Sequence, residues 1–356
     1  MVRILQAQLG AKRPRMTRLS IVIIILLTSI ALIVRPGSPF AAERQRDPFH
    51  FLQPTIQLTE EERRRLEERE VVVRILPAGG HELAFLTAAA LEVGPDALVA
   101  SVRDMPGLKR SSYVPQIGRF SSQPRVEDLR ELTLDVADLD EIRRCRPGRC
   151  GLKLDPEEVV RLHKASGSNE AAASKSAIED EFRRIVVERA RRYLARGGDD
   201  GQPEFGMLLQ HSPYAQLKMP DLVAYLTRYP EARLPDCESF LYWSKETYAW
   251  KPMITVTHVT ILRGSGNEGT PEVVVASRDV FASRYTSGSF IVALLLRNPE
   301  NAAQRYLVYI NRTWVDAVRA LWRPFVEYRV KSQAKKIFAG TRERIERNGL
   351  ASILPK

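Results

Sequence analysis

Histidine and cysteine are scarce in this chain, whose 356 residues include only five histidines and three cysteines. The histidines are scattered, and the cysteines have neither a second cysteine pair nor a nearby histidine pair, so the ligand spacing of a zinc site is missing. No Cys-x-x-Cys-His sequence is present to attach haem. His81 and Glu82 lack the second histidine of a zinc-protease helix. The sequence therefore predicts neither a metal nor a cofactor.

The short motifs of common enzyme classes are also missing from the sequence. It has no Gly-x-Ser-x-Gly turn to present a nucleophilic serine, and no glycine-rich loop to cradle phosphates. We therefore predict no catalytic residue from a motif, and an enzyme is the less favoured interpretation.

Long apolar runs are missing except for one, from Leu19 to Val34, which follows a basic stretch ending at Arg18. As a helix this run would be about 24 Å long, shorter than the roughly 30 Å hydrocarbon core of a bilayer. That length favours a secretory signal over a membrane span. We predict that residues 1–42 are a signal peptide and that the protein is exported to the periplasm or cell envelope. An uncleaved anchor at 19–34 and a buried core helix remain alternatives.

Positive charge is present in excess, but it is unevenly distributed. Of the net charge of +11, residues 1–42 supply six cations and no acid, which leaves +5 for the rest of the chain. Residues 312–347 hold ten Lys or Arg against four acids. A basic segment of this kind is compatible with an anionic membrane surface. Because no concentrated basic patch with stacking aromatics is evident, we predict no nucleic-acid partner.

Two of the three cysteines flank a turn. Cys145 and Cys150 enclose Arg-Pro-Gly-Arg, and a Pro-Gly turn bends the chain back so that the two sulfurs can meet. In an oxidising compartment we predict a disulfide, worth about 2 kcal/mol in the chain-entropy view. Two unpaired thiols are the alternative. Cys237 is expected to be a buried small apolar residue.

The first half of the chain alternates short predicted elements. Residues 43–58 are polar with prolines and are predicted to be a linker. Thr59 and Glu62 form a capping box that opens a short helix. A strand is expected at 71–76, a strand or helix at 81–91, a helix at 95–104 and a strand at 113–121. Residues 155–250 are expected to be mainly helical.

The C-terminal third predicts an antiparallel sheet followed by a long helix. Apolar and β-branched residues predict a strand at 253–262, one or two strands over 273–296, and a strand at 306–310, with short turns between them. Thr313 and Asp316 read as a second capping box, which would open a helix to about Arg347. Apolar residues recur along that helix at steps of three and four, so we expect one apolar face made of Trp314, Val318, Leu321, Phe325 and Tyr328.

This order of elements resembles the START-like (SRPBCC, helix-grip) lipid-binding domains. The resemblance implies an α+β fold in which a curved antiparallel sheet wraps a long C-terminal helix around an apolar cavity. The segment from Val93 to Asp104 is similar to the first helix of that group. On this basis residues 59–348 form a single domain with a helical insertion at about 155–250, and 349–356 form a tail.

The chain also resembles a set of exported bacterial proteins without an assigned activity. That resemblance rests on six short segments: Gly118-Arg-Phe-Ser121, Cys145-Arg-Pro-Gly148 with Cys150, Tyr242-Trp-Ser-Lys245, Thr257-His-Val259, Ala282-Ser-Arg-Tyr285 and the strand end from Tyr306 to Arg312. It implies no chemistry.

Six side chains are candidates for contact with a ligand: Tyr242, Trp243, His258, Arg284, Tyr285 and Phe325. Tyr and Trp suit a cavity mouth because one end of each is apolar and the other polar. A histidine inside a strand can face a cavity and hold a polar head group. A buried arginine needs a carboxylate or an anionic ligand. Core packing, a structural histidine and a solvated arginine are the alternatives.

Three functions follow from these observations. The leading hypothesis is a non-catalytic exported protein that binds a lipid or other hydrophobic small molecule. The second is a cyclase- or hydrolase-like enzyme that uses His258 with Arg284 or Tyr285, which requires these side chains to converge. The third is a structural protein of the cell envelope, which requires the helix to pack against the sheet without a cavity.

Overall fold

A computed structural model describes residues 47–167, 171–197, 203–247, 251–267, 269–316, 318 and 322–353. The predicted signal segment, residues 1–42, lies outside the described residues, and so does Leu321 of the expected helix face. Among the described helices, none is both long and apolar enough to span a bilayer.

Eight strands form one curved antiparallel sheet in the order β1-β2-β8-β7-β6-β5-β4-β3. β-Branched and apolar residues dominate these strands, as in the β5 sequence MITVTHVTILR. β2 pairs with β8 along its whole length, so an early strand and the last strand are neighbours in the sheet. The strands are β1 (Val72–Ile75), β2 (Glu82–Leu91), β3 (Gln116–Arg119), β4 (Cys237–Glu246), β5 (Met253–Arg263), β6 (Val273–Ala282), β7 (Thr286–Arg297) and β8 (Arg305–Val315).

Helices precede, interrupt and follow the strands in the sequence. α3 begins with the predicted capping box, in which the Thr59 hydroxyl accepts from the backbone N–H of Glu62 at 3.2 Å. The described helices are η1 (His50–Leu52), α3 (Glu60–Glu67), α4 (Pro95–Arg103), α5 (Met105–Lys109), η2 (Val126–Leu129), α6 (Val136–Arg144), α7 (Pro156–Ala165), α8 (Ala171–Arg196), α9 (Pro203–Gln210), α10 (Pro213–Lys218), α11 (Pro220–Thr227) and α12 (Arg323–Ile353).

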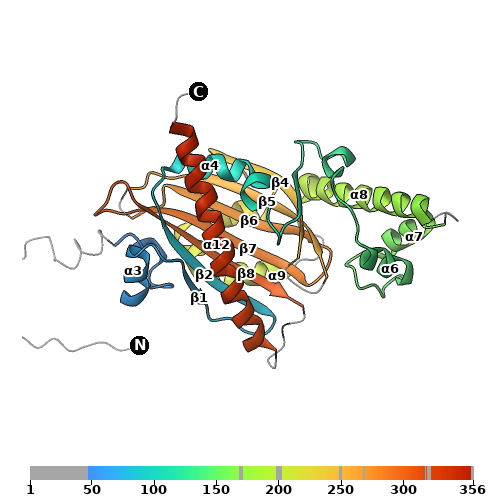
Figure 1. Ribbon diagram of the computed structural model, residues 1–356, viewed down its shortest axis with the longest axis horizontal. Coiled ribbons are helices and arrows are strands. Elements are labelled where there is room, and N and C mark those ends of the chain that lie inside the picture. Colours follow the sequence, from blue (N-terminus) through green and yellow to red (C-terminus); the bar gives the residue numbers. More distant parts are fainter. Residues whose placement is uncertain are drawn as a thin grey trace, which may run out of the picture. The chain divides into compact units, whose positions relative to one another are not determined.

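The two faces of the sheet carry different helices. α12 lies across one face with α4 and α5 beside it (Figure 1), and Phe338 and Ile345 of α12 are buried with Leu98 of α4. On the other face, α9 contacts β7 and β8, and α8 contacts β6. The predicted α+β architecture, with a curved antiparallel sheet, a long C-terminal helix and a helical insertion, is confirmed.

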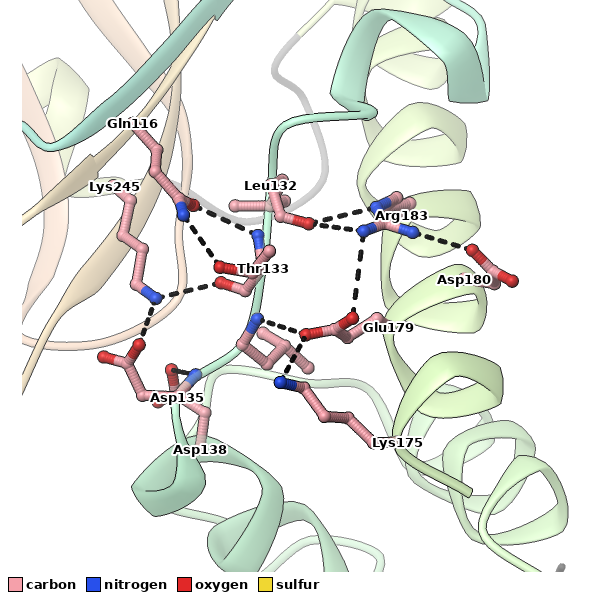
Figure 2. A network of polar contacts seen from close by, with 11 residues as sticks. Gln116, Leu132, Thr133, Asp135, Asp138, Lys175, Glu179, Asp180, Arg183 and Lys245 are labelled. Atoms are coloured by element: carbon pink, nitrogen blue, oxygen red, sulfur yellow. Dashed lines mark hydrogen bonds and ion pairs between the residues drawn. The ribbon is translucent and has the colours of Figure 1, made fainter. Parts of the chain in front are cut away.

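Residues 132–135 form a short segment that lies between β4 and the insertion helix α8 and is bonded to both (Figure 2). The Lys245 ammonium group of β4 donates to the backbone carbonyl of Thr133 at 2.9 Å and to a carboxylate oxygen of Asp135 at 2.6 Å. From the other side, the Arg183 guanidinium donates to the carbonyl of Leu132 at 2.7 Å, and the Glu179 carboxylate accepts from the N–H of Leu134. Buried charges bonded in this way hold α8 in a defined position against the sheet.

The cysteine prediction is confirmed. Cys145 and Cys150 form a disulfide with Cα atoms 4.5 Å apart, at the turn that follows α6. Cys237 is an unbridged thiol at the start of β4 and is half-buried. Burial raises the pKa of this thiol.

Three element predictions differ from the structure. Of the expected linker 43–58, the described part is packed into the protein, with Phe49 and Leu52 buried. The helix expected from Thr313 begins instead at Arg323, because β8 continues through Val315 as a partner of β2 and β7. The helical insertion ends earlier than expected, and the segment around Tyr242 belongs to β4.

Candidate functional site

A cavity of about 670 Å³ lies between the sheet and α12. One face of α12 supplies its roof with Val326, Val330, Ala334, Ile337 and Phe338. These residues follow helical steps of three and four, so they project from a single side of the helix. The volume falls in the range of about 300–1,000 Å³ that is typical of small-molecule sites.

Much of the cavity wall is apolar. α4 and α5 contribute four aliphatic side chains, and the sheet contributes others from alternate positions of its strands, because successive strand residues point to opposite faces. On β7, for example, Ile291 and Ala293 line the cavity while Val292 is buried on the other face. The wall from the two helices consists of Leu98, Val102, Met105 and Leu108.

The floor of the cavity carries a line of polar side chains across five neighbouring strands. We call Tyr242, Thr257, Asp279, Ser289 and Thr313 the polar row. Tyr242 is paired with Thr257, Thr257 with Asp279, and Ser289 with Thr313 in the strand register, and all five line the cavity. Burying a polar group costs free energy unless the group is hydrogen-bonded, so each member of the polar row needs a hydrogen-bond partner.

Asp279 is the central member of the polar row. Its carboxylate accepts a hydrogen bond from the Thr257 hydroxyl at 2.8 Å, and its backbone N–H donates to the Ser289 hydroxyl at 3.2 Å. Burial raises the pKa of the Asp279 carboxyl group, and the nearby charge of Glu246 adds to the rise, against the opposing hydrogen bonds and Lys109. The uncharged acid, a hydrogen-bond donor, thus persists to a higher pH than in an ordinary aspartate.

A charged cluster adjoins one end of the polar row. The Lys109 ammonium group donates to the Tyr242 hydroxyl at 3.0 Å and to the Glu246 carboxylate at 3.1 Å. The Ser244 hydroxyl donates to the same Glu246 oxygen at 2.8 Å. The cation and the anion neutralise one another inside the cavity wall.

At the other end of the polar row, Thr313 is hydrogen-bonded to a chain of uncharged side chains, Asn311 and Tyr309. The Thr313 hydroxyl donates to the Asn311 side-chain carbonyl at 2.7 Å, and the Asn311 amide donates to the Tyr309 hydroxyl at 3.3 Å. Burial raises the pKa of Tyr309 to about 12, so it remains a neutral phenol. The hydroxyl of Thr87, opposite Tyr309 on β2, is only 1% exposed and finds no hydrogen-bond partner among the described residues.

Two of the six predicted contact residues line the cavity, namely Tyr242 and Tyr285. The Tyr285 hydroxyl accepts a hydrogen bond from the backbone N–H of Lys251 at 3.1 Å. Tyr285 lies at the turn between β6 and β7. Its backbone has a positive φ of 67°, a conformation that residues other than glycine rarely adopt.

Trp243 and His258 lie on the opposite face of the sheet. Trp243 is 1% exposed, and its indole N–H donates to the carbonyl of Asp128 at 2.9 Å. His258 is surrounded by Tyr193, Tyr225 and Tyr229, and its Nδ1 lies 2.7 Å from the Tyr193 hydroxyl. Burial, together with the charge of Arg278, lowers the pKa of His258 to about 3, so this histidine is neutral.

Arg284 and Phe325 also lie outside the cavity lining. Arg284 is 4% exposed and is paired with the buried Asp138 carboxylate. Phe325 is 52% exposed. His258, Arg284 and Tyr285 therefore have separate partners, and the convergence that the enzyme hypothesis requires is not formed.

The residues that sequence reasoning missed are the polar members of otherwise apolar strands. Thr257, Asp279, Ser289 and Thr313 carry a signal that is visible only once the register is known, because it is their alignment across strands that sets them apart. No group of three or more potential ligands for a metal ion occurs in the part of the chain that the structure describes.

Comparison with known proteins does not assign the chain to a family. No protein-family model and no curated protein matches the chain.

Proposed function

We propose that this protein binds a hydrophobic small molecule or lipid in the cavity beneath α12, without catalysing its conversion. The observation that carries this proposal is a volume of about 670 Å³ between helix and sheet, lined mainly by apolar side chains on its roof and wall. A cavity of this kind favours burial of apolar surface, at about 25 cal/mol per Å².

The polar row gives the proposed ligand an orientation. Its hydroxyl groups both donate and accept hydrogen bonds, and Thr87 adds a hydroxyl that has no protein partner among the described residues. A ligand with an apolar body and an uncharged polar end fits this surface better than a carboxylate, which would meet Asp279 and Glu246. The polar end would lie on the row, and the body would lie beneath α12.

Native mass spectrometry of the protein, purified from its own source without detergent, tests the proposal. We expect an additional mass that disappears on organic extraction. A stoichiometric polar ligand without an apolar body would contradict the proposal. An empty cavity that also fails to take up the apolar dye Nile red would favour the structural envelope role.

A cavity-filling substitution gives a matched test. Ala293→Trp places a large side chain in the cavity and should abolish Nile red binding, because the volume is then occupied. Ala195→Trp makes the same change at an exposed position of α8 and should bind the dye like the wild type. Equal binding by both variants would place the dye elsewhere.

Acid–base catalysis on a hydrophobic substrate is a second candidate function, favoured by the Asp279 carboxyl group in the cavity. Carboxylic acids that stay protonated in apolar sites serve enzymes as proton donors. If this function applies, protein carrying Asp279→Asn should accumulate an unchanged molecule where the wild type releases an altered one. An identical bound molecule in both proteins would leave binding as the function.

We also propose that the chain is exported. The basic and apolar N-terminal sequence supports this proposal, and so does the disulfide between Cys145 and Cys150, since such bonds persist in oxidising compartments. N-terminal sequencing of protein recovered from the host's envelope fraction tests it. A mature start near residue 43 is expected, and full-length protein in the cytoplasm would contradict export.

A further inference from the structure

Three aromatic side chains at the start of α12 are exposed. Trp322, Phe325 and Tyr328 are 60%, 52% and 74% exposed, respectively. In the described part of the chain, only three other large hydrophobic residues are exposed, and each of those comes from a separate segment. Single exposed apolar residues are ordinary, but a concentration of this kind marks an interaction surface.

Trp322 immediately precedes α12, and Phe325 and Tyr328 lie on the side of α12 that faces away from the cavity. Phe325 and Tyr328 are one helical step apart, whereas Val326 and Val330 project into the cavity from the other side. The helix is therefore apolar on both faces here: the inner face covers the cavity and the outer face has no partner in the described structure. Phe325 and Tyr328, expected on one apolar face of the helix, are exposed and do not line the cavity.

Cations follow the aromatics along the same outer surface. Arg329, Lys331 and Lys335 are exposed within the next two turns, whereas Lys336, also exposed, lines the cavity. The acid nearest to them, Glu327, is half-buried and is paired with Arg323 at 3.2 Å. Between residues 322 and 342 every exposed charged side chain is therefore positive.

Aromatic side chains next to lysines and arginines are the composition of a membrane interface. Trp and Tyr favour the headgroup region because their rings are amphipathic, and lysines near the surface gain about 1 kcal/mol each from anionic lipids. A second copy of the chain is a poor partner, because a two-fold interface would place this cationic surface against itself.

We propose that the surface formed by Trp322 and the outer face of α12 as far as Lys335 docks on an anionic bilayer surface with its three aromatics in the headgroup layer. α12 also roofs the cavity, so docking would bring the roof to the lipid. The docking stands on its own observations and does not require a ligand in the cavity.

Co-sedimentation with vesicles tests the docking, using the full chain and either phosphatidylcholine alone or phosphatidylcholine with phosphatidylglycerol. The variant Arg329→Gln/Lys331→Gln/Lys335→Gln should bind the anionic vesicles about a hundredfold more weakly. The control Lys175→Gln/Arg192→Gln/Arg196→Gln removes three exposed cations from α8 and should lose about threefold or less. Equal losses would indicate a non-specific attraction and overturn the proposal.

Quenching of tryptophan fluorescence by brominated lipids locates the contact. Wild-type protein on anionic vesicles should lose more fluorescence than Trp322→Phe, because Trp322 reaches the headgroup layer. Any membrane insertion by residues 19–34 is common to both proteins, so the difference reports α12. No difference between them would overturn the proposal.

The aromatic contribution is tested with a matched pair of serine variants. Phe325→Ser/Tyr328→Ser should weaken vesicle binding about tenfold, whereas Val160→Ser/Leu217→Ser, at exposed positions of α7 and α10, should leave it unchanged. Light scattering of the wild type supplies another outcome. Self-association that the aromatic variant abolishes would assign the surface to a second copy and overturn membrane docking.

Discussion

Asp279 occupies a position where the alternation of β6 places Val273 and Val275 on the same face. The Asp279 carboxyl group is half-buried in the floor of the cavity and is held by the hydroxyls of Thr257 and Ser289. Such a residue is hard to recognise in the sequence, because one aspartate near the end of an apolar strand resembles the beginning of a turn.

Stability should therefore depend on pH through Asp279. Its pKa is raised in the fold, so the native state retains a proton that the unfolded chain has already released, and stability falls as the pH rises above about 4. Asp279→Asn keeps an acceptor for Thr257 and removes the charge. It should be more stable than the wild type by about 1 kcal/mol at neutral pH and equal to it below about pH 4.

Urea unfolding at the two pH values measures this difference. Asp96→Asn, at an exposed carboxylate paired with Arg263, serves as the control and should change stability little at either pH. A gain in Asp279→Asn that is the same at both pH values would show that the charge is not its cause.

His258 predicts the opposite dependence on pH. Its pKa is lowered from 6.5 to about 3, so below pH 6.5 the unfolded chain binds a proton that the native state refuses until about pH 3. The wild type should lose stability across that window. His258→Gln should remove the slope, while losing about 1–3 kcal/mol at neutral pH with the Tyr193 contact.

Guanidinium unfolding between neutral and mildly acidic pH checks this expectation. His163→Gln, at a half-buried histidine of α7, should keep the dependence of stability on pH that His258 causes. A slope that survives in His258→Gln would assign the acid sensitivity to other groups.

At the scale of elements, the C-terminal helix shows what the sequence can and cannot specify. Residues 313–315 read equally well as a strand end or as the start of a capped helix, since Thr313 and Trp314 suit either element. Register with β2 and β7 decides in favour of the strand, and the Thr313 hydroxyl bonds Asn311 instead of capping a helix. The α4 prediction is confirmed, because Gly94 and Pro95 mark its beginning locally.

The crossing of α12 over α4 depends on a glycine. A Cβ atom at Gly349 would lie 2.6 Å from the Val93 side chain, whereas one at Gly340 would find nothing nearer than the Arg344 guanidinium at 4.0 Å. Gly349→Ala should therefore lower the free energy of unfolding by about 1–3 kcal/mol, since the helices must separate. Gly340→Ala, in the same helix, should raise it by about 0.5–1 kcal/mol.

Thermal and urea denaturation of both alanine variants test this packing. Two variants with the same stability would mean that α12 does not approach α4 as closely at Gly349.

For the molecule as a whole, the layout of sheet, insertion and final helix was predictable from the pattern of elements, whereas the cavity was expected only from the resemblance to helix-grip domains. Antiparallel pairing follows from short turns between apolar strands. A cavity depends on how far α12 stands from the sheet, which side chains at distant positions determine together. Tyr242 and Tyr285 were identified as candidate contacts, whereas the polar row emerges only from the joint register of β4 to β8.

The proposed ligand should contribute to the stability of the whole molecule. A bound molecule stabilises the native state by about 2.7 kcal/mol at a hundredfold excess over its Kd. Protein extracted with organic solvent and refolded should therefore melt about 5 °C or more below protein as purified. Ala293→Trp, with a filled cavity, should melt at the same temperature before and after extraction. If its melting temperature falls as much as that of the wild type, refolding and not loss of the ligand is the cause.

The pairing of β2 with β8 has a consequence for the order in which the chain can assemble. Glu82 and Arg312 lie 230 positions apart and form a buried ion pair, so the middle of the sheet waits for the last strand to be made. Closing so long a loop is slow. During synthesis β1 and β2 can pair with each other, but β2 has no second neighbour until β8 is made. A nascent chain in that condition is still flexible enough to be threaded through a narrow channel.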